Sequence, residues 1–272
     1  MEQKKITFIG AGNMARSIIA GLIASGYPAQ LITATDPNQS QRDFLANEYG
    51  INTEADNQAA ANQAGVIVLA VKPQLMELVG QGLQGVDFTT KLVISIAAGI
   101  NAARLNQMLG AELNLVRVMP NTPALVGKGM SGLYAPEQVS EQDRQFAAEL
   151  MGAVGKVCWV EQESGINNVI AAAGSAPAYF FLFMEAMQAE AIAQGFDADT
   201  ARLLVQQSAL GAAEMVIANP QTEIGTLREQ VTSKGGTTAE ALRTFNEHHL
   251  QDIVAKAMQA AVIRAEEMEK LF

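Results

Sequence analysis

The chain has 272 residues, of which 49% are hydrophobic and 17% are charged, and its formal net charge is −10. This length and apolar content suffice for a sizeable buried core in one or two domains. The acidic balance argues against a nucleic-acid partner, because surfaces that bind nucleic acids are basic. The single cysteine, Cys158, leaves no partner for an internal disulfide, so we expect it in a buried strand of a cytoplasmic protein.

We expect neither a signal peptide nor a membrane partner. The N-terminal residues "MEQKKITFIGAG" lack an apolar stretch followed by a small-residue cleavage site. No stretch is expected to reach the roughly 18 uncharged apolar residues of a membrane span. Glu185 and Glu190 interrupt the longest apolar run.

The first part of the chain alternates apolar strands with helical segments. Runs dense in Val, Ile and Leu are predicted as parallel strands covered on both faces: Lys4–Ile9, Leu31–Thr35, Val66–Val71, Leu92–Ala97 and Asn114–Met119. Met130–Tyr134 and Lys156–Val160 should add strands at the end of the sheet. Helical patterns cover Met14–Ala24 and Gln39–Glu48. This alternation predicts an α/β, doubly wound parallel sheet over residues 1–162.

The chain turns helical after about Val160. The predicted helices are Ile166–Ala172, Ala178–Gln194, Thr200–Ala218 and Thr238–Phe272. Apolar residues cover more than one face of the middle helices, which indicates burial within a bundle or between subunits. We therefore expect a second, all-α domain over residues 163–272.

A glycine-rich turn lies near the start, in "KKITFIGAGNMARSIIAGL". Gly10, Gly12 and Ala15 form the pattern G-x-G-x-x-A between a predicted strand and a predicted helix. Gly10 permits a tight turn, Gly12 lets the backbone approach a pyrophosphate, and Ala15 allows close packing of helix on strand. The alternative is a strand–helix turn that only needs glycine, but the context favours a dinucleotide. The sequence thus predicts NADPH or NADH as cofactor.

The preference between these two cofactors stays open. Asp36 ends the second predicted strand, where an acidic residue commonly meets the adenosine ribose, and alone it favours NADH. Asn38 and Arg42 follow closely and could support a 2′-phosphate instead. We hypothesise that Asp36 sets the preference.

Three further loops are rich in Gly, Ala and Pro and follow predicted strands: Ala70–Gln74, Ser95–Ile100 and Val118–Gly129. Open α/β sheets bind ligands at the carboxyl ends of their strands, so these loops are candidates for lying against a planar nicotinamide. Each of them is equally compatible with ordinary turn chemistry. Asn121, between two prolines, is the most suggestive because a rigid turn would aim its amide.

The segment "VTSKGGTTAEAL" at residues 231–242 allows two interpretations. Thr237 and Glu240 fit a capping box, which would be an ordinary helix start. Capping does not explain Gly235 and Gly236, whose N–H groups can turn toward one point and bind an anion such as a carboxylate. From the residues alone both interpretations remain.

Over essentially its full length the chain resembles the pyrroline-5-carboxylate reductase family. The resemblance is carried by "FIGAGNMARSIIAGL", "LAVKPQ", "SIAAGI", "VRVMPNTPALVGKG", "GSAPAYFFLFMEAM" and "VTSKGGTTAEAL". Lys234 departs from the family's usual proline, which puts the detailed turn geometry in doubt. The resemblance implies an N-terminal Rossmann domain and a C-terminal helical dimerisation domain, in a homodimer or a ring of dimers. It also implies reduction of 1-pyrroline-5-carboxylate to L-proline by NAD(P)H, the last step of proline biosynthesis.

Site residues follow partly from the resemblance and partly from the loops above. The cofactor set is Gly10, Gly12, Asn13, Met14, Asp36, Asn57, Ala70, Lys72, Pro73, Ala97, Gly99 and Asn121. The substrate set is Ser233, Gly236, Thr237, Thr238 and Asn121. Thr238 is the catalytic candidate, which would hydrogen-bond the imine nitrogen or relay a proton through water. No metal is expected, since the hydride is the cofactor's chemistry, and the adjacent His248 and His249 in a predicted helix lack metal-site spacing.

Two alternative functions are weighed against this one. Another two-domain reductase, such as a β-hydroxyacid dehydrogenase, would use a lysine in the long interdomain helix, and "SAPAYFFLFMEAMQAEAIAQ" contains none. A catalytically silent nucleotide-binding regulator would not need Ser233, Thr237 and Thr238 together.

Overall fold

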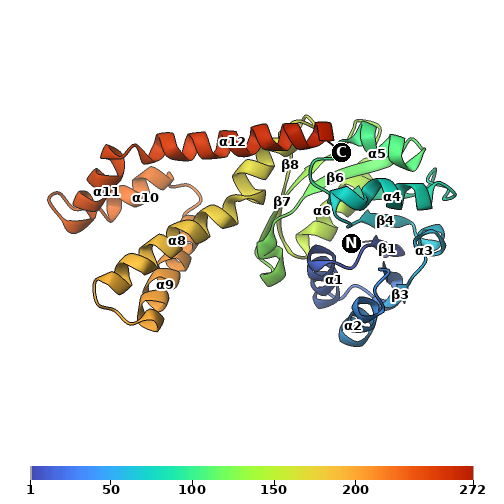
Figure 1. Ribbon diagram of the computed structural model, residues 1–272, viewed down its shortest axis with the longest axis horizontal. Coiled ribbons are helices and arrows are strands. Elements are labelled where there is room, and N and C mark those ends of the chain that lie inside the picture. Colours follow the sequence, from blue (N-terminus) through green and yellow to red (C-terminus); the bar gives the residue numbers. More distant parts are fainter. Residues whose placement is uncertain (1, 272) are drawn as a thin grey trace. The chain divides into compact units, whose positions relative to one another are not determined.

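The computed structural model describes residues 2–271, which form two compact units (Figure 1). The first unit comprises the residues up to Ser175 together with those from Ala261 onward. The second unit is Ala176–Ala260. The domain boundary expected between residues 162 and 163 stays a prediction, and residues 1 and 272 lie outside the described part.

The first unit is built on a sheet that has eight strands in the described part of the chain, in the order β3-β2-β1-β4-β5-β6-β7-β8. Its strands are β1 (Ile6–Ile9), β2 (Ile32–Thr35), β3 (Asn52–Glu54), β4 (Val66–Leu69), β5 (Leu92–Ser95), β6 (Asn114–Met119), β7 (Gly129–Tyr134) and β8 (Gly155–Trp159). Neighbours pair in parallel except β6 and β7. Strand order reverses between β1 and β4, which is the switch point where open α/β sheets bind ligands.

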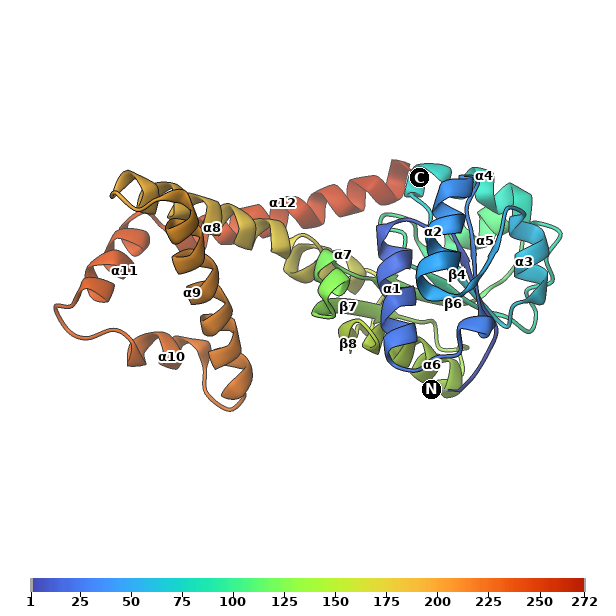
Figure 2. The same ribbon diagram turned by 90° about the horizontal axis from the view of Figure 1, so that it is seen from below.

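Helices cover both faces of this sheet. They are α1 (Asn13–Ala24), α2 (Gln39–Tyr49), α3 (Asn57–Gln63), α4 (Pro73–Leu83), α5 (Ala102–Leu109) and α6 (Glu141–Gly152). Successive strand residues point to opposite faces, so Val68 and Ile94 join a core with α1, α2 and α6, while Ile67 and Val93 join a core with α4 and α5. Figure 2 shows α1 and α2 on one side of the strands and α4 and α5 on the other. The predicted doubly wound sheet is confirmed.

Differences from the predicted strands are small. The β3 strand was missed because three polar residues carry no apolar signal. Cys158 lies on β8 as expected, but at the sheet edge it is half-buried and not buried. Two 3₁₀ helices lie in the connections: η1 (Ala29–Leu31) between α1 and β2, and η2 (Thr122–Val126) between β6 and β7.

A short helical stretch ends the continuous part of the first unit. It consists of α7 (Gly165–Val169) and a π-helical turn, η3 (Ile170–Gly174). The prediction of helix over Ile166–Ala172 is confirmed, although its second half is wound more loosely. Short π-helical turns of this kind occur often at functional sites.

The second unit is helical, as predicted. Its helices are α8 (Ala176–Ala193), α9 (Ala198–Ala218), α10 (Ile224–Gln230), α11 (Thr237–Glu247) and the first part of α12 (Leu250–Leu271). The single helix predicted over Thr238–Phe272 is wrong, because His249 has a φ of 55° and separates α11 from α12. His248 and His249 therefore do not lie within one helix.

The α8 helix is apolar and largely exposed in the single chain. Within the described residues, one helical run, Gly165–Ala193, is long and apolar enough to cross a membrane by length and composition, with a mean hydropathy of 1.4. This differs from the expectation that no stretch would qualify. One such helix is weak evidence for a span, since a helix covered by another subunit passes the same test.

Candidate active site

The turn after β1 has the geometry of a dinucleotide turn. Gly10 has a φ of +102°, and a Cβ atom there would lie 2.8 Å from the carbonyl oxygen of Ala70, so only glycine fits. At Gly12, a Cβ atom would meet nothing within 4 Å. Gly12 is the N-cap of α1, and no described side chain caps this helix. The first N–H groups of α1 are therefore available to phosphate oxygens.

Asp36 braces this turn from the end of β2. Its Oδ2 accepts a hydrogen bond from the backbone N–H of Ala11 at 3.2 Å, and its Oδ1 accepts one from the N–H of Asn38 at 2.9 Å. The guanidinium of Arg42 donates to the backbone carbonyl of Asp36 at 2.5 Å. The acidic and the basic group weighed for cofactor preference thus lie next to each other.

Asn57 begins α3 beside the end of β2. Its Oδ1 accepts a hydrogen bond from the Thr35 hydroxyl at 2.5 Å. The preceding residue, Asp56, is the N-cap of α3 and accepts from the N–H groups of Gln58 and Ala59. Asn57 is therefore held next to the strand whose end commonly meets the adenosine ribose.

The remaining cofactor candidates follow β4 and β5. Lys72 is exposed and is the N-cap of α4, with Pro73 at the first helical position and no described side chain as cap. Ala97 is buried after β5. Gly99 has a φ of +72°, and a Cβ atom there would lie 3.0 Å from the Cβ of Met268 in α12.

Asn121 ties the turn after β6 to η3. Its Nδ2 donates to the carbonyl oxygen of Ala173 at 3.0 Å, and its Oδ1 accepts from the N–H of Met130 at 2.9 Å. The side-chain amide has a second N–H donor besides the one that Ala173 accepts. Its contact with nicotinamide or substrate stays a prediction. The first unit thus places every predicted cofactor residue at the carboxyl end of a strand or at the start of the next helix.

Of the two interpretations of the start of α11, the structure contradicts the capping box. Gly236 is the N-cap, Thr237 is the first helical residue, and no described side chain caps the helix. Glu240 does not reach back but pairs with Arg243 at 3.0 Å. The physical reason is that the glycine turn places the helix start one residue earlier than the box requires. The interpretation that left these N–H groups to an anion is the one that this geometry favours.

The turn before α11 brings together four of the predicted substrate residues, Ser233, Gly236, Thr237 and Thr238, whereas Asn121 belongs to the first unit. Gly235 has a φ of +72°, and the N–H of Gly236 donates to the carbonyl of Ser233 at 3.0 Å. A Cβ atom on Gly236 would collide with the Ser233 hydroxyl oxygen, so only glycine lets this hydroxyl lie over the helix start. Thr237 and Thr238 follow in the first turn of α11.

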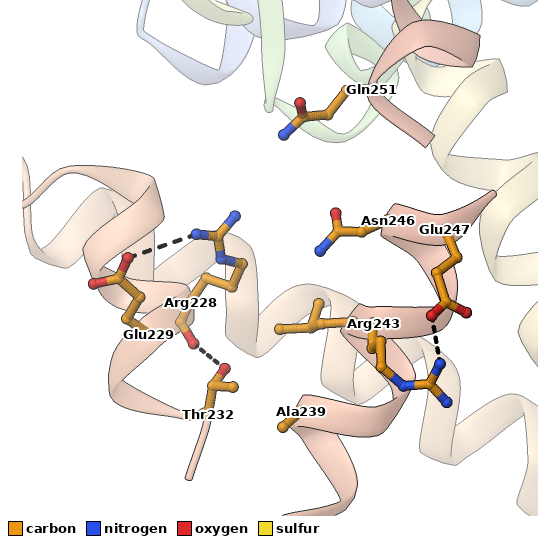
Figure 3. A pocket seen from close by; sticks show the side chains of 9 residues that line it. Arg228, Glu229, Thr232, Ala239, Arg243, Asn246, Glu247 and Gln251 are labelled. Atoms are coloured by element: carbon orange, nitrogen blue, oxygen red, sulfur yellow. Dashed lines mark hydrogen bonds and ion pairs between the residues drawn. The ribbon is translucent and has the colours of Figure 1, made fainter. Parts of the chain in front are cut away.

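A hollow of about 770 Å³ in the second unit is lined by other residues (Figure 3). Its walls are Arg228, Glu229, Thr232, Ala239, Leu242, Arg243, Asn246, Glu247 and Gln251. Both arginines face carboxylates: Arg228 lies 3.7 Å from Glu229, and Arg243 lies 2.5 Å from Glu247. The hollow therefore lacks an excess of positive charge that would attract a carboxylate.

One buried charge near the cofactor edge was missed at the sequence level. Arg117 on β6 has a side chain that is 2% exposed. An arginine inside the apolar run "NLVRVM" was the available signal, because arginine is almost never fully buried without a partner. Within residues 2–271, no group of three or more His, Cys, Asp or Glu residues could hold a metal ion.

These features define a class of protein. A doubly wound sheet with a glycine turn of this shape, followed by a helical unit, is the architecture of a two-domain, dinucleotide-dependent oxidoreductase. The family described as NADP oxidoreductase, coenzyme F420-dependent, matches residues 5–99, and the family described as pyrroline-5-carboxylate reductase dimerisation matches residues 163–268.

Relatives define the family more narrowly. The pyrroline-5-carboxylate reductase of Vibrio alginolyticus is 74% identical over 100% of both chains. A solved pyrroline-5-carboxylate reductase from Coxiella burnetii has a TM-score of 0.93 and 42% identity, covering 98% of this chain and 99% of that one. The Plasmodium falciparum pyrroline carboxylate reductase with NADP bound has a TM-score of 0.87 and 27% identity, covering 99% of each chain. The chain belongs to the pyrroline-5-carboxylate reductase family.

Proposed function

We propose that the chain holds its cofactor at the glycine turn and its substrate carboxylate at the start of α11. It is an NAD(P)H-dependent enzyme that reduces 1-pyrroline-5-carboxylate to L-proline in proline biosynthesis. The observation that carries this proposal is the N-terminus of α11, which is shaped by two glycines and has no described side-chain cap. A β-hydroxyacid dehydrogenase would need a lysine in the long helix α8, which has none, and a silent regulator would not need this helix start. Family membership supports the reaction.

The cofactor supplies the hydride that reduces the C=N bond. In this proposal the first N–H groups of α1 bind the pyrophosphate, and Gly12 leaves the space for it to approach. Asp36 and Arg42 act at the adenosine ribose, with Asn57 beside them. The loops that contain Lys72, Gly99 and Asn121 lie toward the nicotinamide. The full set also includes Gly10, Asn13, Met14, Ala70, Pro73 and Ala97.

The substrate carboxylate is bound by backbone N–H groups of Thr237 and Thr238 and by the Ser233 hydroxyl. Hydrogen bonds to a carboxylate are short and about twice as strong as neutral ones, and the helix dipole adds to them. Reduction adds a hydride to C5 and a proton to the ring nitrogen. We assign the Thr238 hydroxyl a hydrogen bond to this nitrogen. A threonine is a weak acid, so its contribution is to orient the ring and to pass a proton from water.

We further propose that the enzyme works in the cytoplasm as a homodimer or a ring of dimers. The second unit exposes neighbouring apolar side chains on α8, with Phe180, Phe181 and Leu182 each more than 60% exposed. Such a surface on a chain that matches a dimerisation family is best covered by a second copy. One cysteine without a disulfide supports a reducing compartment.

A spectrophotometric assay tests the proposal. The purified chain should oxidise NADPH or NADH in the presence of 1-pyrroline-5-carboxylate and form L-proline in equal amount. Running both cofactors also decides the preference. A chain that binds the cofactor but leaves its absorbance unchanged with this substrate would contradict the proposed function.

A further inference from the structure

A charge cluster around the buried Arg117 joins three elements of the first unit, and its two carboxylates are half-buried. The Nη1 atom of Arg117 on β6 donates to Oε1 of Glu163 at 2.7 Å and lies 3.5 Å from Oε1 of Glu269 near the end of α12. The other carboxylate oxygen of Glu269 accepts from Nδ2 of Asn167 on α7 at 3.2 Å. One cation thus lies between two carboxylates from distant parts of the chain.

The same cluster fixes the ends of two loops that we place at the nicotinamide. Oε1 of Glu163 also accepts from the backbone N–H of Ala102 at 2.7 Å, and Ala102 begins α5 directly after the loop that contains Gly99. A carboxylate at this position also interacts favourably with the helix dipole. Arg117 lies only four residues before Asn121, in the strand that leads to the second loop.

The last turns of α12 contact the loop after β5, which contains Gly99. A Cβ atom on Gly99 would lie 3.0 Å from the Cβ and 3.3 Å from the Cε of Met268, the neighbour of Glu269. Residues of α12 from Ala261 onward belong to the first unit. The end of α12 therefore contacts the loop through Met268 and is held to β6 through Glu269.

An apolar side chain could fill the space that Arg117 occupies. Removing a guanidinium from water is costly, and apolar residues of similar volume often replace a buried ion pair without loss of stability. Within the described residues, Nη2 of Arg117 and Oδ1 of Asn167 are buried without a hydrogen-bond partner. The cluster therefore costs free energy through desolvation, but its hydrogen bonds and ion pairs fix the positions of the elements that they join.

We propose that Arg117, Glu163, Met268 and Glu269, the C-terminal clamp, position the loops after β5 and β6 for the nicotinamide half of NAD(P)H. These are positioning residues, which act through the loops and do not touch the reacting atoms. The proposal rests on the proposed function in taking these loops as the nicotinamide side. It gives the last turns of α12 a role in cofactor affinity.

Calorimetric titration of the full-length enzyme tests the clamp. Glu269→Gln removes one charge. Met268→Ala removes the part of the Met268 side chain beyond Cβ, including the Cε that lies against Gly99. Neither variant leaves Arg117 without a carboxylate partner. Each variant should raise the Kd for NADPH about five- to tenfold, where tenfold corresponds to about 1.4 kcal/mol. The control is Glu267→Gln, the same charge change on the same helix, where Glu267 is exposed and pairs with Arg264 at 2.8 Å. The Kd of this control variant for NADPH should stay within twofold of that of the unaltered enzyme.

Titration with 2′,5′-ADP, which is the adenosine end alone, separates positioning from general loosening. The clamp variants should bind this fragment as the unaltered enzyme does, because the clamp acts on the nicotinamide side. The proposal is overturned if both variants keep the Kd for NADPH within twofold, or if fragment and dinucleotide weaken equally. Failure of the proposed function is seen separately, as an unaltered enzyme that binds NADPH in the calorimeter but does not reduce 1-pyrroline-5-carboxylate.

Discussion

The two units differ in how much apolar surface each of them buries by itself. The first unit has hydrophobic cores on both faces of its sheet. In the second unit, Ala201 and Val205 are the only buried hydrophobic residues, and no residue of α8 is buried. Exposed apolar patches of this kind mark interaction surfaces, and a unit with so little internal core is marginal when it stands alone. The first unit thus folds around its own cores, whereas the second leaves apolar surface that the proposed homodimer would cover.

The units also build their candidate sites differently. In the first unit, the predicted cofactor residues lie in several turns at the carboxyl ends of the strands. Each turn is fixed by a strand within the core. The substrate turn in the second unit is a single segment, Ser233–Thr238, whose geometry depends on two glycines. The four predictions below test this contrast.

The largest effect is expected when the exposed face of the second unit receives a charge. Leu182→Glu would bury a carboxylate without a partner in a homodimer, which should weaken association about 100-fold or more. Sedimentation velocity should show monomers. Leu182 is 68% exposed in the single chain, and Leu78 on α4 is 69% exposed, so Leu78→Glu is the matched control in the first unit. Unchanged association of the Leu182 variant would remove the distinction between the two units.

A smaller effect is expected at the substrate turn. Thr238→Ala removes one hydrogen bond to the substrate, and a loss of about 1.4 kcal/mol lowers kcat about tenfold. Thr244→Ala on the same helix is the control, because the Thr244 hydroxyl donates to the carbonyl of Glu240 at 3.0 Å. Steady-state kinetics should find the control unchanged. A kcat/KM within about twofold for Thr238→Ala would show that this hydroxyl has no such role.

Cofactor preference should respond in opposite directions to two changes in the first unit. Asp36→Ala removes the charge that disfavours a 2′-phosphate and should shift the ratio of affinities toward NADPH, about threefold to tenfold. Arg42→Ala should shift it toward NADH. Both affinities will also fall for Asp36→Ala, because its carboxylate braces the N–H of Ala11. The hypothesis fails if the ratio of NADH to NADPH affinities is the same before and after the Asp36 change.

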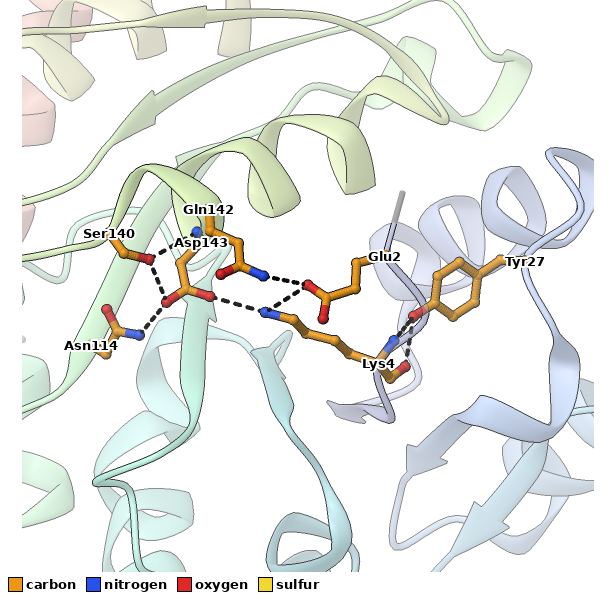
Figure 4. Close-up of polar contacts among 7 residues, drawn as sticks. All are labelled: Glu2, Lys4, Tyr27, Asn114, Ser140, Gln142 and Asp143. Carbon is orange, nitrogen blue, oxygen red and sulfur yellow. Dashed lines mark hydrogen bonds and ion pairs between the residues drawn. The ribbon is translucent and has the colours of Figure 1, made fainter.

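The smallest effect concerns the stability of the first unit, at the start of β1 (Figure 4). Burial raises the pKa of Asp143, but hydrogen bonds from Asn114, Lys4 and Ser140 outweigh it, so the pKa of this carboxyl is lowered. The folded pKa lies below the unfolded value near 4, so the stabilisation is present above about pH 4 and is lost as the pH falls through the folded value.

Asp143→Asn should therefore cost about 1 kcal/mol at pH 7, which is about 2–4 °C in Tm for a chain of this size. Thermal unfolding at pH 7 and pH 3 should show that the difference from the unaltered chain shrinks in acid. Glu137→Gln, an exposed residue near α6, should show no such difference. A gap in Tm that stays constant with pH would contradict the assigned cause.

The sequence predicted what depends on local apolar pattern and glycine chemistry. Parallel strands such as β4 and β5 are continuous apolar runs, and Gly10 and Gly12 sit where their special backbone geometry is needed. The missed β3 has three polar residues and exists because β2 offers it backbone partners. The α10 helix has seven residues, too few for a clear periodic signal.

Contacts between distant residues were beyond prediction. His249 adopts a positive φ without glycine or proline nearby to indicate a break. The amide of Asn121 meets the carbonyl of Ala173, 52 residues away. The charge of Glu269 reaches Arg117 only because the end of α12 belongs to the first unit. Such pairings are properties of the tertiary structure, so no spacing rule in the sequence reveals them.

The most direct test of the account is a crystal structure of the enzyme with L-proline and oxidised cofactor. The carboxylate of L-proline should lie about 2.7–3.1 Å from backbone N–H groups of Thr237 and Thr238, with the ring nitrogen next to the Thr238 hydroxyl. If L-proline binds elsewhere and the start of α11 holds no anion, the assignment of the substrate site is wrong.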